Sequence, residues 1–145
     1  MSFIRVKKVS PNATLPTYGS TGAAGADLYA CLQEDAVIKP GETVRIPTGI
    51  ALEVPAGCAG LIYARSSLGT KRGLAPANKV GVVDSDYRGE ISVLLYNHGN
   101  ETQTIHHGER VAQFLITPVL TPAYVEAEEL TDTERGAGGF GSTGR

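Results

Sequence analysis

The sequence predicts an all-β protein, and it leaves a sandwich, a jelly roll and a barrel open as architectures. Short apolar and β-branched runs are separated by turns, for which the 145-residue chain supplies 18 glycines and 8 prolines. No apolar period of 3.6 residues continues for three helical turns. The length corresponds to one domain, or to one subunit of an assembly.

The expected strands follow in order along the chain. Residues 4–9 alternate in polarity, residues 26–31 follow a loop of small residues, and residues 36–38 end at the Pro40-Gly41 turn. Prolines bound the next two strands, at 43–46 and 50–54. Further strands are expected at 59–63, 80–83, 91–96, 103–105 and 111–118, with 124–128 as a final edge strand. One helical turn is predicted at 66–71, capped by Ser66 or Ser67 and ended by Gly73.

The segment 78–90, NKVGVVDSDYRGE, is predicted to form the tip of a hairpin between two apolar arms. Its two carboxylates, Asp84 and Asp86, suit a general base or a metal site. An EF-hand is excluded, because Arg88 and Leu95 stand at the fifth and twelfth loop positions, where acidic ligands are needed. The alternative is that both acids only favour the turn, and on residue type alone that interpretation is the stronger.

Two further segments carry polar groups suited to a bound anion. Arg65 follows a strand, and Ser66 and Ser67 open the helical turn, which offers a guanidinium, hydroxyls and free N–H groups. An ordinary helix cap beside a surface arginine explains the same residues. In the strand at 111–118, Gln113 lies between apolar neighbours and needs a partner, which is either structural or a ligand.

The segment 131–145 has no aliphatic cluster and is rich in glycine. It contains a GxGxxG pattern that begins at Gly136, but no helix follows it, which excludes the dinucleotide-binding fold. Arg135 and Phe140 suit a mobile lid that meets a phosphate and stacks on a planar base. A disordered tail is the alternative.

The bulk properties bound the partners and the compartment. A net charge of −2 does not favour a nucleic-acid or membrane surface. No stretch reaches the roughly 20 apolar residues of a membrane span, and the N-terminus lacks the apolar core of a signal peptide. Cys31 and Cys58 fit no metal or redox spacing, so we expect two reduced thiols in a cytoplasmic protein.

Five segments, in this order, resemble the five motifs of the homotrimeric dUTPase family, the deoxyuridine 5′-triphosphate nucleotidohydrolases. They are AGADL at 24–28, RSSLG at 65–69, NKVGVVDSDYRGE at 78–90, GERVAQFLI at 108–116 and RGAGGFGS at 135–142. Five motifs in register over nearly the whole chain form a highly specific pattern. Two positions depart from it, because Ser67 stands where glycine is usual and Ala64 where proline often precedes the arginine.

The resemblance implies a jelly-roll-like β domain over residues 1–130 and a mobile tail at 131–145 that closes over a neighbouring subunit's active site. It also implies a homotrimer with shared active sites and no stable nucleic-acid or membrane partner. The implied reaction is the Mg²⁺-assisted hydrolysis of dUTP to dUMP and pyrophosphate, which keeps uracil out of DNA and supplies dUMP for dTMP synthesis. Two alternatives remain: the dCTP deaminases, which share the fold, and a regulatory protein without catalysis.

The resemblance further implies a role for each motif residue. Asp84 is the expected general base for a water that attacks the α-phosphorus in line, and Tyr87 is expected under the deoxyribose. Mg²⁺ is expected on the triphosphate and waters without a direct protein ligand, with Asp27 as outer-shell support. The remaining expected substrate-binding residues line the uracil pocket, hold the phosphates or come from the tail: Asn78, Gly81, Val83, Arg65, Ser66, Ser67, Gln113, Arg135, Phe140, Gly141 and Ser142.

Overall fold

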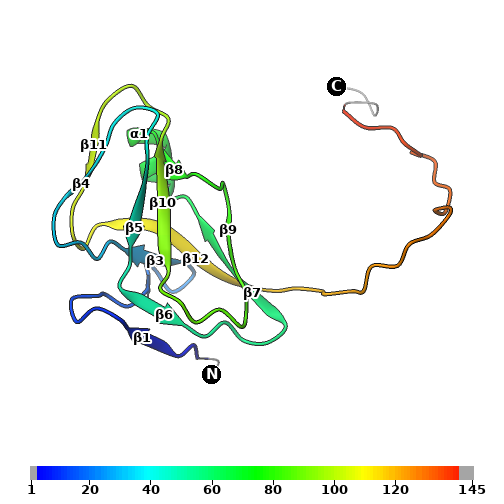
Figure 1. The fold of residues 1–145 in the computed structure, drawn as a ribbon, viewed down its shortest axis with the longest axis horizontal. Coiled ribbons are helices and arrows are strands. Elements are labelled where there is room, and N and C mark those ends of the chain that lie inside the picture. The colour runs from blue at the N-terminus through cyan, green and yellow to red at the C-terminus, as the bar shows by residue number, and fades with distance from the viewer. Residues whose placement is uncertain (1–2, 141–145) are drawn as a thin grey trace.

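The computed structural model describes residues 3–140, and within them the fold is built from short antiparallel strands and one short helix (Figure 1). The predicted all-β class with at most one short helix is therefore confirmed. In chain order the elements are β1 (Val6–Lys8), β2 (Thr17–Tyr18), β3 (Ala26–Tyr29), β4 (Ala36–Ile38), β5 (Thr43–Pro47), β6 (Ile50–Leu52), β7 (Cys58–Tyr63), α1 (Ser66–Arg72), β8 (Leu74–Pro76), β9 (Gly81–Val83), β10 (Ser92–Asn97), β11 (Gln103–Ile105) and β12 (Arg110–Pro118).

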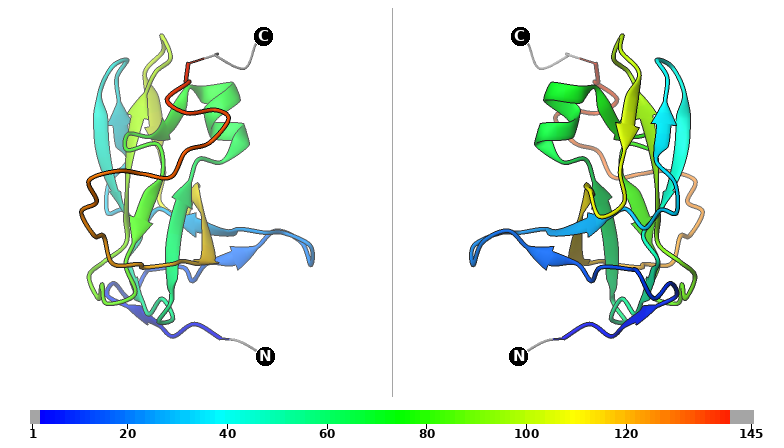
Figure 2. Two further views of the ribbon diagram at one scale, coloured as in Figure 1. Left: turned by 90° about the vertical axis from the view of Figure 1, so that its right-hand side faces the viewer. Right: turned by 90° about the vertical axis from the view of Figure 1, so that its left-hand side faces the viewer.

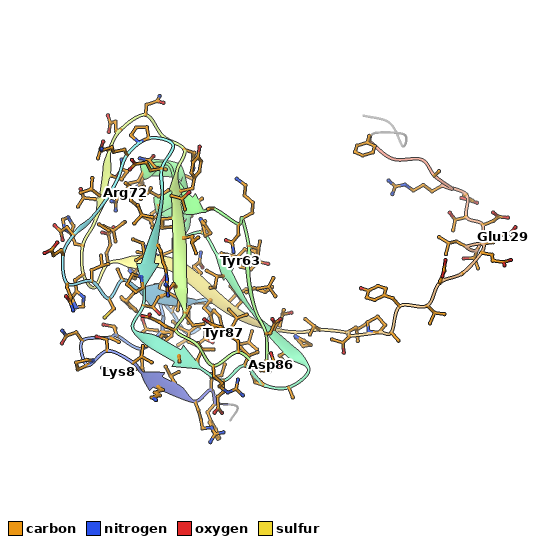
Figure 3. The ribbon with its side chains drawn as sticks, viewed as in Figure 1. Lys8, Tyr63, Arg72, Asp86, Tyr87 and Glu129 are labelled. Carbon is orange, nitrogen blue, oxygen red and sulfur yellow. The ribbon has the colours of Figure 1, made fainter. Side chains whose placement is uncertain are left out.

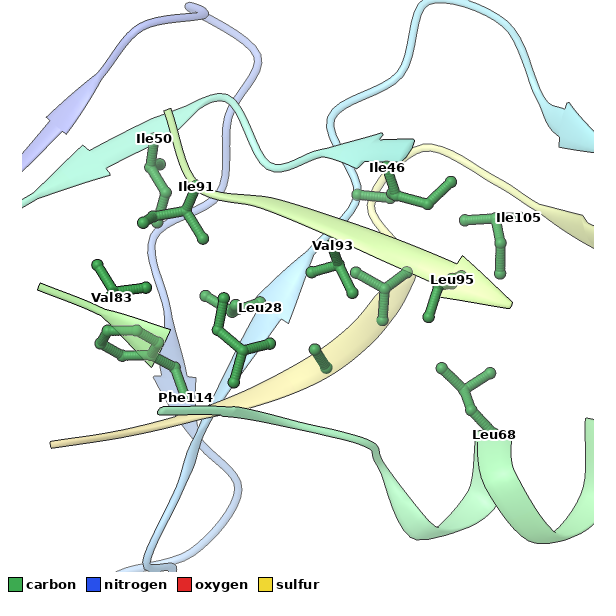
Figure 4. Close-up of a cluster of buried hydrophobic side chains, with 14 of the residues drawn as sticks. Leu28, Ile46, Ile50, Leu68, Val83, Ile91, Val93, Leu95, Ile105 and Phe114 are labelled. Carbon is green, nitrogen blue, oxygen red and sulfur yellow. The ribbon is translucent and has the colours of Figure 1, made fainter. Parts of the chain in front are cut away.

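Two sheets enclose the apolar core. One has the strand order β2-β3-β12-β7-β9 and the other has the order β5-β10-β8, while β1 pairs with β6 and β11 with β4. Figure 4 shows side chains of β5 and β10, among them Ile46, Val93 and Leu95, gathered with Leu28 of β3 and Phe114 of β12. All five side chains are buried, as expected for strands that alternate apolar and polar positions.

Helix α1 lies at one end of the sheets and contributes Leu68 to the core (Figure 2). It ends at Gly73, whose φ of 64° is a left-handed conformation that glycine adopts without steric cost, as predicted. The predicted serine cap is wrong. The N-cap residue is Arg65, in extended conformation, and no side chain caps the helix, so Ser66 and Ser67 are the first two helical residues.

The predicted hairpin is also wrong. Strand β9 pairs with β7, whereas β10 pairs with β5 and β8, so the two apolar runs belong to different sheets. The segment 84–91 therefore crosses from one sheet to the other. Its ends are held by the separate sheets, and local sequence could not predict this because every strand partner is distant along the chain.

Beyond β12 the chain leaves the sheets. Figure 1 shows the tail extending away from the end of β12, and residues 119–140 contain no strand. The predicted edge strand at 124–128 is therefore absent, and Tyr124 and Val125 are 98% and 85% exposed. Among the residues that the structure describes, no helix has both the length and the apolar character needed to cross a membrane.

Candidate active site

The first group of predicted residues gathers where β3 and β12 meet the end of β7. Asp27 of β3 is buried, and its carboxylate accepts hydrogen bonds from Arg65 Nε at 2.9 Å and from Arg110 at 3.2 Å. Gln113 pairs in register with Asp27 on one side and Tyr63 on the other. Asp27 thus neutralises part of the charge of two arginines and fixes their positions.

Gln113 has the partner that its burial requires. Its Nε2 donates to the carbonyl oxygen of Ala64 at 3.1 Å, so the amide braces the backbone immediately before Arg65. A structural partner therefore exists, and the side-chain oxygen of Gln113 also lies 3.3 Å from where a Cβ on Gly25 would stand. Because Gly25 has no side chain, the side-chain oxygen of Gln113 is not covered on that side.

The start of α1 adds hydroxyls to this cationic region. Ser66 and Ser67 are exposed, and a pocket of about 480 Å³ is lined by Ser67 together with four cationic side chains, those of Arg65, Lys71, Arg72 and Arg110. Sequence reasoning assigned no role to Lys71, Arg72 or Arg110. Their separate positions on the helix and on β12 gave no local signal. Arg72, at the end of α1, pairs with Glu109, the residue before Arg110, and this contact brings the helix and β12 residues to one pocket.

A second pocket, of about 300 Å³, contains the predicted residues of the third motif. Asn78, Gly81, Val83 and Tyr87 all line it. A Cβ at Gly81 would stand 3.1 Å from Ile62 Cβ and 3.4 Å from Asn78 Nδ2, so a larger residue would crowd both walls. The pocket thus combines an amide, backbone polar groups and apolar walls, which suits a small planar heterocycle.

Tyr87 stands at the edge of this pocket with a fixed orientation. Its hydroxyl donates to the carbonyl oxygen of Glu90 at 3.1 Å, and its Cε2 is 2.9 Å from where a Cβ on Gly89 would lie. Glycine at position 89 lets the ring fold over the backbone. Sequence reasoning missed Arg45 and Glu90, which line the same pocket.

Asp84 directly follows the buried Val83, and its side chain is exposed. Its carbonyl oxygen accepts the N–H of Tyr87 at 3.2 Å, so residues 84–87 form a tight turn. The carboxylate is therefore held at the pocket's end by its backbone while its oxygens face solvent. That environment allows it to bind a water.

The pocket of the third motif adjoins the end of β7, because Gly81 pairs with Ile62, but Asp84 does not lie beside Arg65 within one chain. Val83 pairs with Gly60, so Asp84 lies beside the start of β7, whereas Arg65 follows the end of that strand. The five residue steps from Gly60 to Arg65 span roughly 17 Å of extended chain. In Figure 3, Asp86 and Tyr87 lie toward one end of the sheets, and Arg72, at the end of α1, lies toward the other.

A direct metal ligand set is absent from residues 3–140, where no three His, Cys, Asp or Glu side chains are grouped to hold an ion. Both oxygens of Asp27 contact guanidinium groups, which leaves this carboxylate suited to a hydrogen bond with a metal-bound water. These donors fit Mg²⁺ that keeps its waters and binds phosphate oxygens, the arrangement this ion prefers in nucleotide sites.

The tail residues lie apart from both groups. Arg135 Nε donates to the carbonyl oxygen of Gly138 at 2.8 Å, and the ring of Phe140 is fully exposed. Gly141 and Ser142 are outside the described residues. Arg135 and Phe140 therefore line neither of the two pockets of their own chain.

The model of the dUTPase family matches residues 11–144. The chain belongs to the dUTPase family. A deoxyuridine 5′-triphosphate nucleotidohydrolase from Desulfitobacterium hafniense is 51% identical over 131 residues, which cover 90% of this chain and 87% of the relative. One of the same name from Nautilia profundicola is 50% identical over 142 residues, covering 98% of this chain and 99% of the relative. The family predicted from the five motifs is confirmed.

Solved dUTPase structures share the fold. A mutant dUTPase of Staphylococcus bacteriophage 80alpha, with dUpNHpp, superposes with a TM-score of 0.91 at 28% identity and covers all of both chains. A mutant dUTPase from phage phi11 of S. aureus has a TM-score of 0.82 at 25% identity, covering 90% of this chain and 100% of that one. The second structure is described as showing the coordination of a structural Mg(II) ion.

Proposed function

We propose that this dUTPase hydrolyses dUTP to dUMP and pyrophosphate, at sites shared between the subunits of a homotrimer. The activity follows from membership of the family over residues 11–144 and from relatives of that activity at about half identity. The shared site rests on one observation. Asp84 follows Val83, which pairs with Gly60, whereas Arg65 lies beyond the end of β7 at Tyr63, so the proposed base and this arginine are separated along the strand within one chain.

The pocket of the third motif binds the base and the sugar. Asn78 and the backbone beside Gly81 and Val83 pair with the uracil edge, and crowding around the base disfavours the methyl group of thymine. Tyr87 packs under the deoxyribose and excludes a 2′-hydroxyl. A clash or an unpaired polar group beneath the sugar discriminates between a deoxyribonucleotide and a ribonucleotide much more strongly than the loss of an apolar contact would.

The cationic group of a neighbouring subunit holds the triphosphate. Arg65, Ser66, Ser67 and Gln113 supply a guanidinium, two hydroxyls and an amide near exposed helix N–H groups. These groups stabilise the negative charge that moves onto the leaving pyrophosphate. Ser67 adds a hydroxyl where glycine is usual, and its exposure leaves room for the loop to keep its shape.

Asp84 orients a water for in-line attack on the α-phosphorus and accepts its proton. The water oxygen forms a bond to this phosphorus while the bond to the oxygen bridging the α- and β-phosphorus atoms breaks, which releases dUMP and pyrophosphate. When bound to the triphosphate, Mg²⁺ would neutralise part of its negative charge. Asp27 holds Arg65 and Arg110 in place and hydrogen-bonds a water of the metal's shell.

Residues 1–130 form the catalytic domain, and residues 131–145 act as a lid over the site of another subunit. The exposed side chains of the tail support this role, because among residues 3–140 nothing covers Phe140, and the hydrogen bond of Arg135 there is to the tail's own backbone. Phe140 stacks on uracil, Arg135 meets the γ-phosphate, and Gly141 and Ser142 complete the closure. Two free cysteines, Cys31 and Cys58, are consistent with a cytoplasmic enzyme that limits uracil in DNA and supplies dUMP.

The direct test is pyrophosphate release from dUTP, dTTP, dCTP and UTP in the presence of Mg²⁺. We expect turnover of dUTP alone, because thymine, cytosine and ribose each fail one contact of the pocket. Ammonia release from dCTP without pyrophosphate from dUTP would show a deaminase instead. Wild-type turnover no faster than that of Asp84→Asn would show a protein without this catalysis.

A further inference from the structure

The crossing segment 84–91 is fastened to the turn between β5 and β6. Ile91 accepts hydrogen bonds at its carbonyl oxygen from Thr48 N at 3.2 Å and from Thr48 Oγ1 at 2.6 Å, and its N–H donates to Ile50 at 2.8 Å. Thr48 is fully buried. These hydrogen bonds fix the position of the end of segment 84–91 relative to the core.

Glu90 adds a carboxylate bond to this set. Its Oε1 accepts the N–H of Gly49 at 2.8 Å, and its Oε2 lies 3.9 Å from a guanidinium nitrogen of Arg45. The carbonyl oxygen of Glu90 holds the hydroxyl of Tyr87 at 3.1 Å. One residue therefore contacts the turn through its side chain and Tyr87 through its backbone.

The anchor on the other side of this bond is rigid. Gly49 is buried with a φ of 68°, and a Cβ there would stand 2.7 Å from Cys31 Sγ and 2.8 Å from Ala13 Cβ. The backbone at Gly49 is thus packed on both sides and cannot follow a moving loop. Because the carboxylate of Glu90 is hydrogen-bonded to this N–H, the rigid backbone at Gly49 restrains the position of Glu90.

We propose that Glu90 is a positioning residue that fixes Tyr87 through the Gly49 hydrogen bond and so sets the discrimination between deoxyribose and ribose. The inference rests on the proposed role of Tyr87 under the sugar. Glu90 and Tyr87 line the same pocket, so a small shift of the Glu90 carbonyl moves the tyrosine hydroxyl directly. Without the Gly49–Glu90 hydrogen bond, the ring of Tyr87 can move aside for a 2′-hydroxyl.

The test compares Glu90→Ala, Glu90→Asp and Glu90→Gln with the wild-type full-length protein, using kcat/KM for dUTP and for UTP. Alanine removes the acceptor, aspartate withdraws it by one methylene, and glutamine keeps an oxygen within reach of Gly49. We expect the ratio of the two kcat/KM values to fall about tenfold for alanine and aspartate and to stay within about twofold for glutamine.

Glu42→Ala is the matched control. Glu42 Oε2 accepts the N–H of Lys39 at 3.0 Å, which is the same kind of carboxylate–backbone bond at an exposed turn away from the pocket. We expect this variant to keep the wild-type ratio. If Glu90→Ala does not fold, Glu90→Asp carries the comparison. A folded variant without the Gly49 bond that keeps the wild-type ratio contradicts the proposal, and so does a loss in Glu90→Gln equal to that in Glu90→Ala.

A second readout reports on Tyr87 without any substrate. The protein is labelled with 3-fluorotyrosine, and the ¹⁹F resonance of Tyr87 is assigned by its loss in Tyr87→Phe. We expect this resonance to shift or broaden in Glu90→Ala and Glu90→Asp and to stay in place in Glu90→Gln. An unchanged resonance in the first two overturns the positioning role. A wild-type enzyme that accepts UTP as well as dUTP removes the sugar role of Tyr87, while the ¹⁹F measurement still decides the role of Glu90.

Discussion

At the scale of single residues, one carboxylate organises the cationic half of the site. Asp27 holds Arg65 and Arg110, and only 11% of its side chain is exposed against 20% and 49% for the two arginines. The sequence placed Asp27 in a motif, but its partners stand 38 and 83 residues away and could not be read from local pattern. The pairing depends on the register of β3 with β12, which only the folded sheet defines.

Asp27→Asn is expected to lower the free energy of unfolding by about 1–3 kcal/mol, because the neutral amide leaves the part-buried guanidinium of Arg65, and the more exposed one of Arg110, without their anion. Urea denaturation at one protein concentration measures this change. Glu53→Gln is the control, since its ion pair with Arg5 is largely exposed, and it should cost less than about 1 kcal/mol. Equal losses of unfolding free energy in the two variants would show that the burial of Asp27 does not strengthen its ion pairs.

Asp84→Asn is expected to reduce kcat by about 10²–10⁴-fold with little change in KM, because it removes the proposed base but leaves the pocket. The side chain is exposed, so folding should be unaffected. Asp86→Asn is the matched control, an exposed acid two residues further along the same loop, and should keep kcat within a few-fold. Steady-state pyrophosphate release measures both, and the reverse ranking would place the base at Asp86.

At the scale of elements, local pattern predicted most strands but not how they pair. Proline and glycine turns separated the apolar runs correctly, whereas β2 and β8 were missed because one has two residues and the other directly follows the helix. The hairpin between β9 and β10 was wrong, since two adjacent apolar runs do not reveal which sheet each joins. The serine cap was wrong because Arg65, fixed by Asp27, occupies that position.

The approach of β7 to β12 depends on a glycine. A Cβ at Gly60 would stand 2.7 Å from Phe114 Cε2, so Gly60→Ala should lower the free energy of unfolding by about 1–3 kcal/mol through overpacking. Gly69→Ala is the control, because its Cβ would meet nothing closer than 3.9 Å inside α1 and should stabilise by about 0.5–1 kcal/mol. Thermal unfolding of the two variants should move in opposite directions, and a shared direction would contradict this packing.

At the scale of the whole molecule, the predicted site residues of one chain are spread out. The strand positions beside Asp84 and at Arg65 are roughly 17 Å apart along β7, and the tail extends away from the end of β12 (Figure 1). The sequence motifs predicted residues of the base pocket and of the cationic group. The order of the motifs along the chain does not say which subunit supplies which residues to one site. Assembly, as proposed above, makes one site from residues of different subunits.

Removal of residues 135–145 is expected to leave the oligomeric state of the full chain unchanged and to reduce turnover at least about 100-fold, because a lid is lost and no core residue is removed. Light scattering measures the first and pyrophosphate release the second. The full-length double variant Arg135→Ala/Phe140→Ala should reproduce most of the loss. Dissociation of the oligomer on truncation would instead assign the tail a structural role.

The shared site is tested most directly by mixing two inactive variants. Asp84→Asn removes the base, and Ser66→Glu places a negative charge in the phosphate group; both side chains are exposed, so both variants should fold. The two proteins are unfolded together, refolded at equal amounts and assayed for pyrophosphate release from dUTP. If Asp84 and Ser66 of different subunits meet at one site, random assembly restores about a quarter of the wild-type activity. Activity no higher than that of either variant alone would contradict the shared site.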